Sequence, residues 1–431
     1  MTMRRHFKKT LANGLRVVCI PQNHLHACEV SCYVGVGSRY ESEDQAGMSH
    51  FLEHMLFRGT AEYPNSLELE KAFEALGGGA NAATDAESTC YFSRFHPGKI
   101  DEGLALFASM LQRPLLEDIE IERKIIIEEA QEDYNEEGVE INPDSLMARL
   151  LWPESTLARP TIGSLESIAR VDRTMLRDYH SRYYTPPNTV IAVAGRIEPE
   201  GVFDAAERCF GRWGGTGVPE LIEVDAVAGP RTEWVKDSAS QLAVQLAFPL
   251  PGRESSHALG LRILRRILSG GVASRLMMQL RENLGLTYNV EANLTVLAET
   301  GALVIDLMVT PENLVEAVRE VCHVMDDLCR QPIPAEEFSR IVQNYHYDLD
   351  FSNDHPDEMV VRYGWGDLVG FVRDVEDDRE ALDALTPARL AETVSRCIKP
   401  QQVKLVVVGP YRRSDQQIVE GCLDSFVENF S

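Results

Sequence analysis

The sequence has no long hydrophobic run and few basic residues for its length of 431 residues. No apolar stretch approaches the roughly 18 residues that a membrane-spanning helix needs. The basic opening MTMRRHFKKTLANGL lacks an apolar stretch, so we expect neither a secretory signal nor a transit peptide. With 42 Lys and Arg against 67 Asp and Glu, the net charge is −25, which disfavours nucleic acid and favours cationic partners. These deficits predict a cytoplasmic protein that binds neither membranes nor nucleic acids.

The cysteines do not form any pair with CxxC spacing, which argues against a zinc ribbon and against a dithiol redox motif. Their number is odd and they are scattered along the chain. We therefore expect buried thiols in a reducing compartment. The nine residues are Cys19, Cys28, Cys32, Cys90, Cys209, Cys322, Cys329, Cys397 and Cys422.

The chain divides near its middle at a stretch rich in Gly, Pro and Val, which we interpret as a linker over residues 216–230. The flanking segments, 1–215 and 231–431, close in the same way: a helix leads into an apolar strand that ends in glycine, and another helix follows. The two glycines, Gly195 and Gly409, lie 214 positions apart. This spacing predicts tandem duplication of one unit, although strand–Gly–helix arrangements are common enough to recur by chance.

Several other segments alternate apolar with small or polar residues, as strands with one covered face do. The sequence therefore predicts an α+β fold made of two tandem homologous domains. Each domain is expected to be a mostly antiparallel sheet backed by helices. The segments are HACEVSCYVGVG, QLAVQLAFP and ALVIDLMV.

A helix-like apolar stretch from Gly47 to Thr60 contains the pattern HxxEH, formed by His50, Glu53 and His54. Residues four apart lie on one helix face, so both imidazoles can reach a single metal ion with Glu53 on the same side. Glu53 can then take a proton from a water molecule that the metal has made more acidic. One histidine on an apolar face is usually a core residue, whereas two with a glutamate indicate a metal site. Two histidines leave a third ligand to be found.

A second helical stretch, residues 116–134, supplies a candidate for that ligand. Glu122, Ile125, Ile126 and Glu129 fall at positions i, i+3, i+4 and i+7, which lie on one stripe. A carboxylate on an apolar stripe needs a partner, and a metal ion facing Glu129 would be one. Glu122 could orient a ligand histidine. Considered alone, Glu129 is better explained by a solvated acidic face, because further acidic residues lie near it.

Three segments together resemble the inverted-zincin M16 metallopeptidases, the family of pitrilysin and the mitochondrial processing peptidase, in its small two-domain M16B form. The segments are HFLEHMLFRGT, GGGANAATDAESTCYF and ERKIIIEEAQE, and the resemblance extends over nearly the whole chain. Family members carry HxxEH and a downstream glutamate in an ER-x-x-x-x-x-E pattern. Glu129 matches it, 75 positions after His54 and seven after Glu122. The resemblance thus implies Zn²⁺ bound by His50, His54 and Glu129 rather than Glu128.

The resemblance also implies a peptide-binding strand. The segment from Asn81 to Phe92 corresponds to an edge strand that pairs with the substrate backbone, where main-chain bonds give affinity with little sequence demand. The small residues at its start would let a substrate approach. Without the family resemblance, an ordinary core strand would be the better interpretation. The implied substrate-binding residues are Asn81, Ala82, Ala83 and Thr84.

The second half contains no HxxEH, so we expect no second metal there. Its segment LRENLGLTYNVEA resembles the RE-x-x-x-x-x-Y segment of active family members. The resemblance implies that Arg281 holds the substrate and that Tyr288 donates a hydrogen bond to the developing oxyanion. Spacing alone would leave them as a surface arginine and a core tyrosine.

Together these features predict a zinc-dependent endopeptidase that cleaves unfolded peptides or leader segments, with Glu53 as the general base. A two-domain chain closes the family's four-domain chamber only by pairing. We therefore expect a homodimer first and a heterodimer with a related chain second. Two alternatives remain: an assembly subunit without catalysis, as in the respiratory-complex core proteins, and a metal-dependent hydrolase acting on another substrate.

Overall fold

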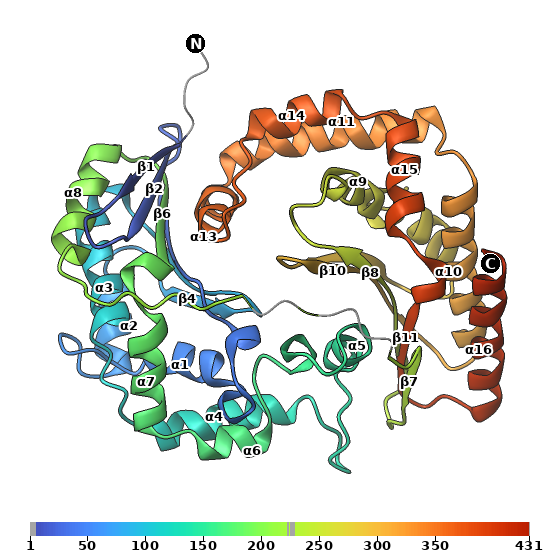
Figure 1. Cartoon of the computed structure of the whole chain (residues 1–431), viewed down its shortest axis with the longest axis horizontal. Helices are drawn as coiled ribbons and strands as arrows, with labels where there is room; N and C mark the ends of the chain where they lie inside the picture. The colour runs from blue at the N-terminus through green and yellow to red at the C-terminus, as the bar shows by residue number, and fades with distance from the viewer. Residues whose placement is uncertain (1–5, 222–223, 225–228, 431) are drawn as a thin grey trace. The chain divides into compact units, whose positions relative to one another are not determined.

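The computed structural model describes residues 6–221, 224 and 229–430 of the chain. Internal contacts divide the chain into two compact units. Each unit contains one β-sheet with helices packed against it, which confirms the predicted α+β class (Figure 1). Within the described ranges there is no helix that is both long and apolar enough to cross a membrane.

Both units draw on segments from both halves of the sequence. The first includes Asp348–Asp377, and the second includes Glu132–Ala158. Each of these segments contributes a helix that packs on the sheet of the unit to which it belongs. The remaining segments are Met1–Gln131 and Arg159–Ile222 in the first unit, and Glu223–Tyr347 and Asp378–Ser431 in the second.

The units therefore do not coincide with the linear division into residues 1–215 and 231–431. The physical reason is burial, since both sheets have apolar strands whose second face is covered by a helix from the other half of the sequence. The predicted linker, 216–230, stays a prediction. Residues 222–223 and 225–228 of that linker lie outside the described residues.

The first sheet has six strands in the order β1-β2-β6-β3-β5-β4. Strands β2 and β6 are parallel, and every other neighbouring pair is antiparallel. All residues of β3 and β6 are buried, as expected for central strands covered on both faces. The strands are β1 (Phe7–Thr10), β2 (Arg16–Pro21), β3 (Cys28–Val34), β4 (Ala80–Thr84), β5 (Thr89–Phe95) and β6 (Thr189–Gly195).

Helices cover this sheet on both faces. Helices α1, α3 and α8 contact its strands, and α12 and α13 pack on β6. Gly364, next to α13, permits the close approach, because a Cβ there would lie 2.4 Å from the Cβ of Ala192. The helices of this unit are α1 (Met48–Leu56), α2 (Ser66–Glu74), α3 (Ile100–Gln112), α4 (Ile119–Gln131), α6 (Leu165–Arg170), α7 (Arg173–Tyr183), α8 (Pro199–Phe210), α12 (Pro356–Val360) and α13 (Gly366–Leu368).

The second sheet has five strands in the order β7-β11-β8-β10-β9. Its first pair is parallel and the others are antiparallel. The same order and directions hold for β2-β6-β3-β5-β4 in the first sheet, which supports the predicted duplication. The strands are β7 (Thr232–Val235), β8 (Leu242–Pro251), β9 (Val290–Val296), β10 (Thr300–Val309) and β11 (Lys404–Val408).

The strand-ending glycines repeat in detail. Gly195 and Gly409 have φ angles of 128° and 133°, which side chains rarely tolerate. A Cβ at Gly195 would lie 2.4 Å from the carbonyl oxygen of Ala27, and one at Gly409 would lie 2.8 Å from that of Gln241. Each glycine therefore packs closely against the backbone just before the neighbouring strand, β3 for Gly195 and β8 for Gly409. These are equivalent points of the two sheets.

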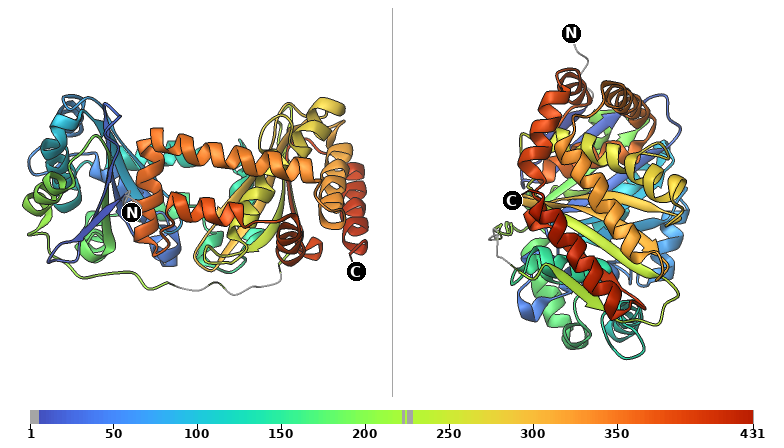
Figure 2. Two further views of the ribbon diagram at one scale, coloured as in Figure 1. Left: turned by 90° about the horizontal axis from the view of Figure 1, so that it is seen from above. Right: turned by 90° about the vertical axis from the view of Figure 1, so that its right-hand side faces the viewer.

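Helices α10 and α16 lie side by side in the second unit (Figure 2), and α5 packs on β8 and β11. Buried Leu146, Met147 and Leu150 of α5 join a core cluster with Val406 of β11. The helices are α5 (Pro143–Leu151), α9 (Ala258–Ser269), α10 (Leu314–Arg330), α15 (Pro387–Cys397) and α16 (Arg413–Glu428), together with α11 (Ala335–Phe351) and α14 (Val375–Asp383), within which the chain passes from one unit to the other.

Candidate metal centre

Helix α1 carries the HxxEH pattern near the first sheet. Its residues Phe51, Leu52 and Met55 are buried in the core of the unit. These apolar side chains fix the rotation of the helix, so that His50 and His54 emerge together on another side. Their ring centroids are 4.6 Å apart. The structure thus brings the two predicted imidazoles together.

The start of α1 is held by groups that sequence reasoning missed. The buried carboxylate of Glu41 accepts hydrogen bonds from the backbone N–H groups of Gly47, at 2.7 Å, and Ser49, at 2.6 Å. The hydroxyl of Ser49 lies 2.7 Å from that of Tyr179. Burial raises the pKa of Glu41 to about 7, although the hydrogen bonds from Ser49 and Gly47 oppose the rise. The only signal in the sequence is an acidic residue shortly before a helix start.

Helix α4 brings Glu129 to the two histidines. Its Oε1 lies 3.6 Å from Nε2 of His50, and its Oε2 lies 3.5 Å from Nε2 of His54. One ligand atom from each of the three residues can be chosen so that all lie within 4.8 Å of one another. A tetrahedral zinc ion with bonds of about 2.0–2.1 Å separates its ligand atoms by about 3.3 Å. The donor set of two imidazoles and one carboxylate therefore fits zinc with little rearrangement.

Glu122 contacts the rear of one imidazole, as predicted for a residue that orients a ligand. Its Oε1 lies 2.8 Å from Nδ1 of His54, and its Oε2 lies 3.5 Å from Nε of Arg58. When Nδ1 of His54 carries the proton and donates a hydrogen bond to Glu122, Nε2 of His54 is left free to bind a metal. Burial alone lowers the pKa of His54, but the hydrogen bond and charge of Glu122, together with the charges of Glu53 and Glu129, outweigh it and raise that pKa.

The environment of His50 differs from that of His54. Its Nδ1 is buried and has no hydrogen-bond partner among the described residues. Burial, with the neighbouring His54, lowers the pKa of His50 to about 4. This imidazole is therefore neutral near pH 7, which is the form that binds a metal ion.

Glu53 lies beside the histidines and receives a hydrogen bond from the hydroxyl of Thr84 at the end of β4. Burial raises the pKa of the Glu53 carboxyl, while the hydrogen bond from Thr84 and the charge of His54 oppose the rise. The contact with Thr84 was not foreseen, because Thr84 was expected to contact substrate. The structure thus groups Glu53 and Thr84 with the predicted ligands.

The stripe predicted on α4 holds only in part. Glu122 and Ile126 are buried, whereas Ile125 is 47% exposed. The reason is the helical period of α4. Glu122, Ile126 and Glu129 (positions i, i+4 and i+7) face α1, whereas Ile125 (position i+3) lies on the exposed side together with Ile121. Glu129 is 46% exposed at its side chain, so it forms the open side of the site.

Strand β4 is one of the two edge strands of the first sheet and pairs with β5. Asn81 and Ala83 are exposed, while Ala82 and Thr84 are partly buried. The expectation of a single edge strand from Asn81 to Phe92 is wrong, because a turn follows Thr84 and the chain returns as the inner strand β5. The side chain of Asp85 stabilises this turn by accepting hydrogen bonds from the N–H groups of Glu87 and Ser88, at 2.6 and 2.7 Å.

Arg281 and Tyr288 belong to the second unit, where the guanidinium of Arg281 lies 4.9 Å from the centre of the Tyr288 ring. Tyr288 is 83% exposed, so the core position that spacing alone suggested for it is wrong. An exposed tyrosine held against an arginine by a cation–π contact has its hydroxyl available to a ligand. Their approach to the metal centre stays a prediction.

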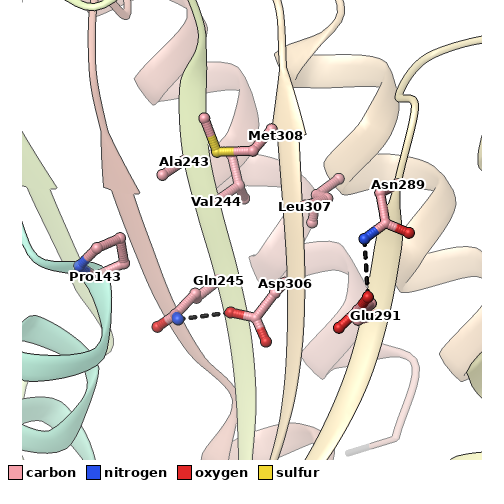
Figure 3. A pocket seen from close by; sticks show the side chains of 9 residues that line it. All are labelled: Pro143, Ala243, Val244, Gln245, Asn289, Glu291, Asp306, Leu307 and Met308. Carbon is pink, nitrogen blue, oxygen red and sulfur yellow. Dashed lines mark hydrogen bonds between the residues drawn. The ribbon is translucent and has the colours of Figure 1, made fainter.

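The second unit also contains a pocket of about 200 Å³ on its sheet (Figure 3). Its polar wall is a hydrogen-bonded network in which the amide nitrogen of Gln245 donates to Asp306 and Asp144, at 2.6 and 2.7 Å. Asn293 donates to the other oxygen of Asp306, at 3.3 Å, and Asn289 donates to Glu291, at 2.9 Å. Both oxygens of Asp306 therefore already have donors.

Comparisons with known proteins identify a family for the chain. Residues 16–164 match the family described as insulinase (peptidase family M16), and residues 170–345 match the peptidase M16 inactive domain. An uncharacterized zinc protease of Mycobacterium bovis is 31% identical over 413 residues, covering 94% of this chain and 93% of that protein. The mitochondrial cytochrome b-c1 complex subunit 1 of Rattus norvegicus is 31% identical over 268 residues, covering 60% and 54%. A protease structure from Helicobacter pylori superposes with a TM-score of 0.86 at 22% identity, covering 94% and 99%.

Proposed function

The chain belongs to the M16 family of peptidases, and from this premise we propose that it is a zinc-dependent endopeptidase acting on unfolded peptides or leader segments. The observation that carries the proposal is the cluster of His50, His54 and Glu129, whose ligand atoms lie within 4.8 Å of one another, with Glu53 beside it. Similarity to proteins named zinc proteases supports the same metal.

In the proposed reaction, Nε2 of His50, Nε2 of His54 and a carboxylate oxygen of Glu129 would hold the zinc ion. A bound zinc ion supplies a more acidic water and polarises a carbonyl oxygen. Glu53 accepts a proton from the water as its oxygen attacks the peptide carbon, and later gives that proton to the departing amine. Glu122 keeps the proton of His54 on Nδ1 throughout.

Substrate binding is proposed at β4. Its outer edge has no neighbouring strand in the sheet order, so an extended peptide can add there through main-chain hydrogen bonds. Ala82 and Ala83 have small side chains that leave room for the backbone of a peptide, and Asn81 is exposed beside them. Recognition through the backbone suits a peptidase that accepts many sequences.

The remaining parts of the proposal concern the second unit and the assembly. Arg281 would hold the substrate and Tyr288 would donate to the developing oxyanion. A homodimer, or else a heterodimer with a related chain, would complete the enzyme. A reducing cytoplasm suits the nine cysteines, all of which are free thiols.

A second candidate function is an assembly role without catalysis. The similarity to a cytochrome b-c1 complex subunit favours it, because that protein is named for the complex in which it assembles. Against it stands the site itself, since a structural subunit needs neither two facing imidazoles nor a carboxylate beside them. The two functions make opposite predictions for zinc content and peptide cleavage.

The test uses zinc analysis and cleavage of unstructured peptides by wild type, Glu53→Gln and Glu128→Gln. Glu53→Gln keeps the shape of the base and all three ligands, so it should retain zinc and lose about 10²-fold or more in kcat. Glu128→Gln makes the same chemical change on the exposed side of α4 and should behave as wild type. A zinc-loaded wild type that cleaves no unstructured peptide, alone or with a related chain, would overturn the enzyme proposal in favour of the assembly role.

A further inference from the structure

The carboxylate of Glu53, the proposed general base, has a hydrogen-bonding partner in a fixed position. The hydroxyl of Thr84 donates a hydrogen bond to Oε2 of Glu53. Among the described residues, Thr84 is the one hydrogen-bond partner of this carboxylate. Oε1 of Glu53 is therefore the oxygen left to accept a proton.

Thr84 can hold the carboxylate because its own position is fixed. It ends β4 and pairs with Thr89 of β5, whose hydroxyl donates to the carbonyl of Val36 at 2.9 Å. The next residue, Asp85, receives a hydrogen bond from the hydroxyl of Ser88 at 3.0 Å and donates its N–H to the Ser88 carbonyl at 2.9 Å. The hydroxyl of Thr84 therefore projects from a paired strand end next to a closed turn.

Thr84 and Glu53 belong to different secondary-structure elements. Glu53 lies on α1, whereas Thr84 lies on the sheet, and α1 contacts both β4 and β5. A glutamate side chain on its own has three rotatable bonds and samples several positions. A hydrogen bond from the sheet restricts the carboxylate to one of them.

We propose that Thr84 is a positioning residue for the reaction. This inference rests on the proposed peptidase function. Thr84 holds Oε2, so that Oε1 of Glu53 takes the proton when an O–H bond of water breaks and the water oxygen bonds to the peptide carbon. The same oxygen releases that proton to the nitrogen as the C–N bond breaks, which restores Glu53.

This role differs from peptide pairing, the role that the edge strand itself suggests for Thr84. Strand addition uses the N–H and C=O groups of the main chain, which every residue except proline supplies equally. Positioning of Glu53 uses the hydroxyl. Thr84→Val removes the hydroxyl and keeps the β-branched shape, while Thr84→Ser keeps the hydroxyl and loses only a methyl group.

The test compares kcat and KM for peptide cleavage by the zinc-loaded full chain as wild type, Thr84→Val and Thr84→Ser. Misplacement of a catalytic group costs about 10²-fold, so Thr84→Val should lower kcat by about 10- to 100-fold, with KM changed less than about twofold. Thr84→Ser should recover most of the kcat. Thr295→Val makes the same replacement at an exposed position of the edge strand β9 and should leave both constants unchanged.

A second readout does not depend on activity. In crystal structures of the two Thr84 variants, the Glu53 carboxylate should leave its position in Thr84→Val and keep it in Thr84→Ser. An unchanged kcat in Thr84→Val, a loss confined to KM, or equal losses in both variants would overturn the positioning role alone. An inactive wild type would overturn the proposed function and this role with it.

Discussion

The contact between Glu122 and His54 allows a quantitative prediction for metal affinity. Glu122→Gln keeps the length of the side chain and leaves an amide oxygen that can accept the proton of His54 Nδ1. What it removes is a negative charge 2.8 Å from the imidazole, on a residue that is 6% exposed and therefore weakly screened by water. Loss of such a partner typically weakens metal binding about 10- to 100-fold, or about 1.4–2.7 kcal/mol.

Glu122→Ala should weaken zinc binding further than Glu122→Gln. It leaves the N–H of His54 without an acceptor and removes the carboxylate that lies 3.5 Å from Arg58. A buried donor without a partner costs about 1–3 kcal/mol in addition. The order of zinc affinity is therefore expected to be wild type, then Glu122→Gln, then Glu122→Ala.

The assay is a competition titration in which a chromophoric chelator and the protein share limiting zinc. Glu120→Gln is the matched control, because Glu120 lies on the same helix, points outward and pairs with Arg123. The thermal midpoint of each zinc-free variant separates lost affinity from lost fold. Zinc affinity of Glu122→Gln within twofold of the control would refute the reasoning that this carboxylate tunes the metal ligand.

Two further predictions concern the start of α1. Because burial raises the pKa of Glu41 to about 7, the folded chain keeps this proton between about pH 4.5 and 7 while the unfolded chain releases it, so stability falls as pH rises through that window. Urea titration at several pH values should measure this effect. Between pH 4.5 and 7, the free energy of unfolding of wild type should fall by on the order of a few kcal/mol relative to that of Glu41→Gln. A difference between the two proteins that does not change with pH would contradict the prediction. Gly47→Ala should lower the thermal midpoint more than Gly138→Ala, because both glycines have positive φ but only at Gly47 would a Cβ lie 2.3 Å from the carbonyl oxygen of Ile162. Equal shifts would show that backbone strain, and not the clash, decides the cost.

The duplicated architecture could be predicted from the sequence because its signals are local. Each strand that ends in Gly195 or Gly409 reads as an apolar run closed by a glycine, and the helices on either side have clear periodicity. The exchange of Glu132–Ala158 and Asp348–Asp377 between the units could not be predicted in this way. An amphipathic helix such as α5 shows that it covers an apolar face, but its sequence does not say which sheet provides that face.

The metal ligands were predictable for a related reason. His50 and His54 lie one helical turn apart, so their proximity follows from the helix alone. Glu129 needed a second helix and was chosen by its spacing and by family resemblance. The contact between Thr84 and Glu53 was missed because it joins a strand end to a helix 31 positions away, and no periodic pattern records it. Ile125 was wrongly placed on the buried stripe of α4. Positions i+3 and i+4 lie on different sides of a helix axis, so a helix that packs against one neighbour can bury one of them and expose the other.

The missed cap at Glu41 and the predicted Glu122 together explain why α1 is held in one place. Burying a carboxylate is unfavourable unless hydrogen bonds offset the cost. Glu41, 3% exposed, receives its bonds from the first turn of α1, and Glu122 meets His54 in the last turn. A rotation or slip of α1 would break these hydrogen bonds to both buried carboxylates, so the two costs oppose such a displacement of the helix. The acidic excess of the chain is thus more than a solvated surface, because two of its carboxylates fix the helix that presents the imidazoles.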